Sequence, residues 1–152
     1  MRIYRKHHTL IVQSEILIKV AGFVSAGTYG AENAKASAFF PIIFVRSEEY
    51  ATPLFINHER IHFRQQLETL FIGSWLLHLF EDVYSRVFLK MKSPEYYLYR
   101  AVEQEAYRNQ HNLSYLQTRP WFSTFSYIKD KRTITFIPDR APEVTIGEKI
   151  LK

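Results

Sequence analysis

Residues 52–70 read TPLFINHERIHFRQQLETL, and this stretch decides the fold because it predicts a long helix. Thr52 is a good helix cap, and Pro53 suits the first helical position, where its missing N–H would have no helical partner anyway. Apolar residues recur along the stretch and continue beyond it. We therefore expect a helix from Pro53 to about Leu70, which can extend to about Leu89.

Within this helix, His58-Glu59-Arg60-Ile61-His62 forms the pattern H-E-x-x-H. Residues i and i+4 lie about 40° apart around a helix axis, so both imidazoles can bind one metal ion. Glu59 lies beside the two histidines, where its carboxylate can take a proton from water. We expect His58 and His62 to be metal ligands and Glu59 to be a general base. The alternative is a pair of histidines that make structural hydrogen bonds.

A second long helix is expected from about Pro94 to about Leu116, with Pro120 as its stop. The two helices resemble the gluzincin zinc metallopeptidases, and also small uncharacterised bacterial proteins with the pattern H-E-x-x-H-x-x-Q-Q-x-E, over about residues 39–117. The resemblance implies that the third zinc ligand is a glutamate within a stretch like E-x-x-A-D. The matching stretch here is Glu103-Gln104-Glu105-Ala106-Tyr107, so Glu103 is the implied ligand and Tyr107 replaces the aspartate.

Glu103 and Glu105 cannot both point at one metal ion, because residues i and i+2 of a helix lie about 200° apart around its axis. On a continuous helix Glu103 shares its stripe with tyrosines and Gln110, which suits the lining of a cleft. This favours Glu103 as the ligand, and Glu105 stays the alternative. Tyr99, Tyr107 and His111 are candidates for stabilising an oxyanion.

The rest of the chain predicts strands before the helices. Phe39–Val45 is strongly apolar, and Pro41 within it predicts a strand at a sheet edge, because proline cannot donate to a ladder. Other expected elements are strands at Thr9–Val12 and Ile16–Val20, turns over Ala21–Gly30, a short helix at Trp121–Ile128 and a strand at Ile134–Ile137.

We expect one α+β domain over residues 1–152. A small N-terminal antiparallel sheet with an edge strand precedes two long helices that carry a zincin-like metal site. The core covers about residues 9–129, and the tail over residues 130–152 is loosely held.

Composition limits the classes of function. The 152 residues include no cysteine, which excludes disulfides and thiolate metal sites. The net charge of +5 comes without a nucleic-acid motif, so no nucleic-acid partner is expected. Neither a signal peptide nor a transmembrane helix is expected. The apolar window Leu70–Phe80 is too short to span a bilayer, and we expect it first of all to form a buried core helix. A cytoplasmic location is predicted, with peripheral membrane contact through that window as a further expectation.

These observations predict a Zn²⁺-dependent metallopeptidase. His58, His62 and Glu103 are the expected ligands and Glu59 the expected base, with a peptide or protein as substrate. Two alternatives stay open: a non-catalytic zinc-stabilised binding domain, and a membrane-surface protein that needs no metal.

Overall fold

The computed structural model describes residues 1–136 and 144–150, except for the side chains of residues 25–31. The chain divides into two compact units, Met1–Phe63 and Arg64–Lys152. The boundary between them falls inside one continuous helix, α2 (Pro53–Glu68). Both helices and strands are present, so a mixed α/β chain is confirmed.

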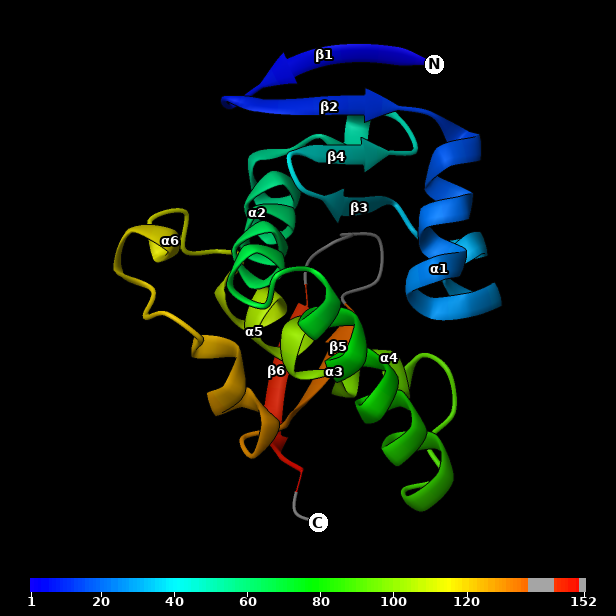
Figure 1. Ribbon diagram of the computed structural model, residues 1–152, viewed down its shortest axis with the longest axis vertical. Helices are drawn as coiled ribbons and strands as arrows, with labels where there is room; N and C mark the ends of the chain where they lie inside the picture. Colours follow the sequence, from blue (N-terminus) through cyan, green and yellow to red (C-terminus); the bar gives the residue numbers. More distant parts are fainter. Residues whose placement is uncertain (137–143, 151–152) are drawn as a thin grey trace. The chain divides into compact units, whose positions relative to one another are not determined.

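A four-stranded sheet forms the first unit, with the strand order β1-β2-β4-β3 (Figure 1). The β1–β2 and β3–β4 pairs are antiparallel. His7 and His8 form the turn of the first hairpin with positive φ angles of 48° and 61°, which suits a two-residue turn of type I′. The strands are β1 (Arg2–Lys6), β2 (Thr9–Gln13), β3 (Ala36–Phe39) and β4 (Ile42–Val45).

The expected all-antiparallel sheet is wrong, because β2 and β4 pair in parallel. A parallel pair needs a crossover connection, and α1 (Glu15–Asn33) provides it where a strand and turns were expected. Ser14 caps this helix, since its hydroxyl accepts a hydrogen bond from the N–H of Leu17 at 3.3 Å. The cap outweighs the strand propensity of the β-branched residues that follow.

Pro41 lies in a turn and not in a strand, which corrects the expected strand over Phe39–Val45. The cis Phe40–Pro41 bond forms the two-residue connection between β3 and β4, a place that cis proline favours. The missing N–H therefore interrupts no ladder. β4 is an inner strand of the sheet, and β3 is the edge strand beside it.

The first half of α2 packs on this sheet. Thr52 caps the helix as predicted, because its hydroxyl accepts a hydrogen bond from the N–H of Phe55 at 3.2 Å. Phe63 meets Phe40 of the β3–β4 turn edge to face, with 5.5 Å between ring centroids. Apolar burial thus holds the turns of α2 that carry the histidines. The core is formed by Ile11, Ile43, Val45, Ala51 and Ile56.

The helix expected from Pro53 to about Leu70 is confirmed as α2, whereas its possible extension to about Leu89 and the second long helix are both interrupted. The first breaks after α2 at Leu70 and Phe71, which have positive φ angles, and the second breaks at Arg100, whose backbone is extended. The resulting helices are α3 (Ile72–Val83), the π-helical η2 (Tyr84–Phe88), α4 (Glu95–Tyr99), α5 (Ala101–Asn109), α6 (Tyr115–Thr118) and the 3₁₀ helix η3 (Ser123–Ile128). A further 3₁₀ turn, η1 (Glu48–Tyr50), belongs to the first unit.

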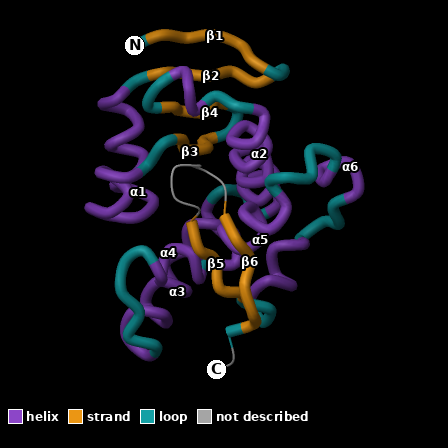
Figure 2. The backbone as a smooth tube through the Cα atoms, turned by 180° about the vertical axis from the view of Figure 1, so that it is seen from behind, coloured by secondary structure: helices purple, strands orange, loops and turns teal. Residues whose placement is uncertain are grey.

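A hairpin of β5 (Arg132–Phe136) and β6 (Val144–Lys149) closes the second unit beside α4 and α5 (Figure 2). The strand expected at Ile134–Ile137 corresponds to β5, and its last residue lies outside the described residues. β6 has no counterpart among the expected elements. Leu98, Tyr107, Ile134 and Val144 form the apolar core of this unit.

Candidate metal centre

The two histidines of H-E-x-x-H converge on one point beside α2. Their Nε2 atoms lie 3.2 Å apart, and their rings meet edge to face with 4.8 Å between centroids. His58 is buried, and His62 is partly exposed. Since His58 and His62 lie one turn apart, the helix alone brings the two nitrogens together.

The separation of these nitrogens fits a tetrahedral metal site. Two imidazole nitrogens that bind the same zinc at 2.0–2.1 Å with tetrahedral angles lie about 3.3 Å apart. The observed 3.2 Å matches this value, and it equally fits a hydrogen bond between the two imidazoles, the alternative that the sequence left open.

Glu103 completes a group that can hold a metal ion. Ligand atoms of His58, His62 and Glu103 all lie within 4.8 Å of one another. Glu103 is 4% exposed, so its carboxylate is nearly removed from water. Within the part of the chain that the structure describes, no other group of three histidine or acidic side chains has such an arrangement. The structure thus brings together the three residues that the sequence singled out, and their role as ligands stays a prediction.

Glu103 lies in the first turn of α5, and side chains of α3 fix where that helix begins. The Glu81 carboxylate accepts a hydrogen bond from the N–H of Ala101 at 2.7 Å, which satisfies one of the free donors of the helix start. Asp82 accepts two hydrogen bonds from the buried Arg100 guanidinium, at 2.7 and 2.6 Å. Lys131 pairs with the other oxygen of Glu81. Buried charges on α3 therefore position α5 and, with it, Glu103.

Tyr97 supports Glu103 and was not predicted from the sequence. Its hydroxyl makes a hydrogen bond with the Glu103 side chain. Burial, followed by the charge of Glu103, raises the pKa of Tyr97 well above its ordinary value. The helical wheel drawn through residues 94–116 could not show this contact, because the break at Arg100 changes the phase between the tyrosine and the glutamate.

Glu105, the alternative ligand, is engaged elsewhere. Its two oxygens accept hydrogen bonds from Gln65 at 2.8 Å, from Tyr115 at 2.9 Å, and from Thr124 and Arg119. Burial alone would raise the pKa of Glu105, but hydrogen bonds from Arg119, Thr124 and Gln65 hold it below its ordinary value. We call this group, with Glu68, the Glu105 cluster; it consists of Gln65, Glu68, Glu105, Tyr115, Arg119 and Thr124.

The Glu105 cluster fixes the second half of α2. Gln65 donates to the Val102 carbonyl at 3.1 Å as well as to Glu105, and Glu68 accepts hydrogen bonds from Arg119 and from the N–H of Phe122. The helix that carries the histidines is therefore bound to α5 by its next turn.

Glu59, the expected base, is buried on α2 directly after His58. The other candidates lie in different surroundings. Tyr107 belongs to the apolar core and packs edge to face on Phe136, with 5.7 Å between ring centroids. The Lys131 ammonium lies over the Tyr99 ring, and His111 is exposed.

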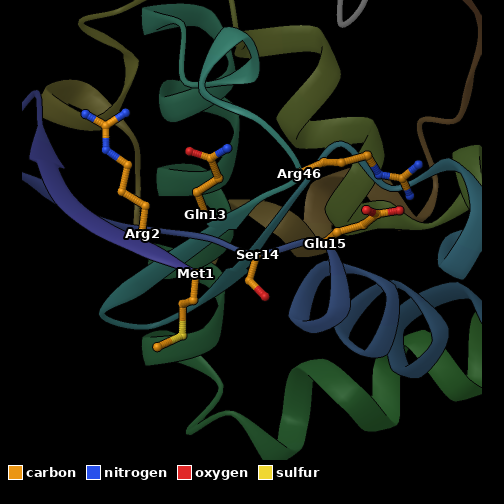
Figure 3. Close-up of a pocket in the computed structure, with 6 residues that line it drawn as sticks. All are labelled: Met1, Arg2, Gln13, Ser14, Glu15 and Arg46. Carbon is orange, nitrogen blue, oxygen red and sulfur yellow. The ribbon is translucent and has the colours of Figure 1, made fainter.

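A surface pocket lies at one end of the sheet, where α1 begins (Figure 3). Three of its polar side chains already have structural partners: Arg2 binds Glu48 at 2.7 Å, Ser14 caps α1, and Glu15 pairs with Lys19 at 2.9 Å. None of its six lining residues belongs to the metal-binding group. We assign no chemistry to this pocket.

Comparison with known proteins finds no matching family model, no matching curated protein and no matching solved structure. Function must therefore be argued from the side chains themselves.

Proposed function

We propose that this chain is a zinc-dependent hydrolase that cleaves peptide bonds. The observation that carries the proposal is the convergence of the His58 and His62 nitrogens at 3.2 Å, in one group with Glu103. Two nitrogens and one carboxylate oxygen are the donor set of many catalytic zinc sites, which keep one position open. Without cysteine in the chain, His, Asp and Glu are the donors available to such a site.

When bound, the metal supplies a Lewis acid that polarises a carbonyl group and lowers the pKa of water. Glu59 would accept the proton of the attacking water at a carboxylate oxygen and then donate it to the leaving amine. In the H-E-x-x-H pattern, a glutamate one residue after His58 would hold that oxygen beside the imidazoles rather than among the ligands. Tyr97 would hold the Glu103 carboxylate in place through its hydrogen bond.

Strand β3 offers a place for an extended peptide. It is the edge strand of its sheet, next to β4. The turn that follows it packs on α2 at Phe63, the residue after His62. An extended peptide that adds to this edge would therefore run close to the histidines.

A cleavage assay with zinc-loaded protein and a fluorogenic peptide library tests the proposal. Glu59→Gln should lose at least about 100-fold in turnover, because it removes the base, and should keep its zinc. Glu95→Gln makes the same chemical change at an exposed position on α4 and should match the wild type.

Undiminished turnover in Glu59→Gln would refute the proposed mechanism. If the wild type binds zinc and cleaves nothing, the chain is a non-catalytic zinc-stabilised domain instead, and chelation should lower its melting temperature.

A further inference from the structure

Helix α3 and η2 have their polar and apolar faces reversed relative to a helix of a water-soluble protein. The buried side carries Ser74, Glu81 and Ser85, which are at most 4% exposed. The exposed side carries large apolar residues along one stripe, and each is more than half exposed. We call this stripe the outer face of α3–η2; its largest members are Ile72, Trp75, Leu76, Leu79, Phe80 and Phe88.

The spacing of these residues is regular. Ile72, Leu76 and Phe80 follow steps of four positions, with Trp75 and Leu79 beside them, which places these five on one side of α3. Phe88 joins them through ring stacking, because Phe80 stacks on Tyr84 and Tyr84 stacks on Phe88. Water-soluble monomers rarely expose a continuous apolar patch of this kind without a use for it. The outer face therefore needs an explanation beyond chance exposure of single residues.

Within the segment that carries the outer face, the exposed charges are of one sign. Between residues 70 and 92 the exposed charged residues are Arg86, Lys90 and Lys92. The two carboxylates of this segment, Glu81 and Asp82, bind Lys131 and Arg100 on the protein side. A partner for this face must therefore match both an apolar stripe and a positive rim.

We propose that the outer face of α3–η2 is a docking surface for an anionic lipid bilayer. The apolar residues would insert among the acyl chains, and Arg86, Lys90 and Lys92 would bind lipid phosphates. A second copy of the chain fits less well, because its own outer face brings the same basic residues and no acidic ones. Trp75 and Tyr84 suit the boundary between water and acyl chains.

The geometry favours a helix that lies on the bilayer. The twelve residues of α3 extend about 18 Å, against about 30 Å for the hydrocarbon core. Among the described residues, no helix has the length and apolar character needed to cross a membrane. The outer face would enter the headgroup region side-on. This inference is independent of the proposed hydrolase activity.

Vesicle flotation of the full chain tests the proposal. The wild type should float with vesicles of phosphatidylcholine and phosphatidylglycerol, and less with phosphatidylcholine alone or at high salt. Leu79→Glu/Phe80→Glu should reduce the bound fraction about tenfold or more. The matched control Ile3→Glu/Leu113→Glu adds the same two charges at exposed apolar positions elsewhere and should float like the wild type. Circular dichroism checks that both variants fold.

A second readout uses Trp75 alone. The chain has two tryptophans, so Trp121→Phe leaves Trp75 as the reporter, and its emission should shift to the blue when anionic vesicles are added. The proposal fails if the wild type stays with the soluble fraction, or if the Leu79→Glu/Phe80→Glu variant floats unchanged. It also fails if light scattering finds a dimer that this variant dissociates, because the face would then bind a second copy.

Discussion

Glu105→Gln should destabilise the chain strongly although the two side chains have nearly the same shape. An amide has one NH₂ group in place of one carboxylate oxygen. One oxygen of Glu105 accepts from Tyr115 and Arg119, and the other accepts from Gln65, Thr124 and Arg119. Either orientation of the amide therefore sets its NH₂ group against at least two donors, and the buried Arg119 loses one of its two carboxylates.

Breaking a buried ion pair by removing one partner costs about 3–5 kcal/mol. For a chain of this length that lowers the melting temperature by roughly 10 °C. Urea unfolding followed by circular dichroism measures the change in the free energy of unfolding. Glu95→Gln is the control, and at an exposed site it should stay within about 0.5 kcal/mol of the wild type. A loss of less than about 1 kcal/mol in Glu105→Gln would refute the view that the Glu105 cluster holds α2 and α5 together.

Two further predictions concern the second unit. Gly73→Ala should cost about 1–2 kcal/mol in thermal unfolding, because the added methyl group would lie 2.9 Å from the Thr69 β-carbon; unchanged stability would mean that the start of α3 can move. Burial raises the pKa of Tyr115 above its ordinary value of 10.0. The folded state therefore keeps the phenol proton to a higher pH than the unfolded state does. The free energy of unfolding is unaffected below about pH 10 and should fall above it, where only the unfolded state loses the proton readily. Tyr115→Phe should show a shallower alkaline fall in urea titrations, and a curve parallel to the wild type would contradict this.

The residues of α2 show what could be predicted from the sequence. Thr52 and Pro53 mark the start of the helix through local chemistry, and the spacing of His58 and His62 fixes their convergence once the helix forms. These signals act within a few residues, so one sequence suffices to find them. That a glutamate of residues 103–107 joins the group came from a family resemblance, and the helical stripe then favoured Glu103 over Glu105.

The elements that were missed depend on partners far along the chain. α5 begins at Ala101 because Glu81 accepts a hydrogen bond from the Ala101 N–H and Asp82 binds the preceding Arg100. No local sequence signal marks this break between α4 and α5. Tyr97 meets Glu103 only because of the same break. Pro41 was assigned to a strand because its run is apolar, whereas its place in a tight turn follows from the pairing of β3 with β4.

The inverted polarity of α3 explains why its sequence was ambiguous. Its apolar residues suggested a buried core helix, yet the structure buries Glu81 and Ser74 and exposes Leu76 and Phe80. Hydrophobic periodicity locates a helix and its apolar side, but it does not show whether that side faces protein or another apolar phase. Here the buried ion pairs with Lys131 and Arg100 decide the orientation.

Calorimetric titration of Zn²⁺ into metal-free protein tests the central claim most directly. We expect one ion per wild-type chain, an equal stoichiometry in Glu59→Gln, and an affinity lowered at least about 100-fold in His62→Ala and Glu103→Gln. A wild type that binds no zinc, or a Glu103→Gln variant that binds it as tightly as the wild type, would contradict a site built from His58, His62 and Glu103.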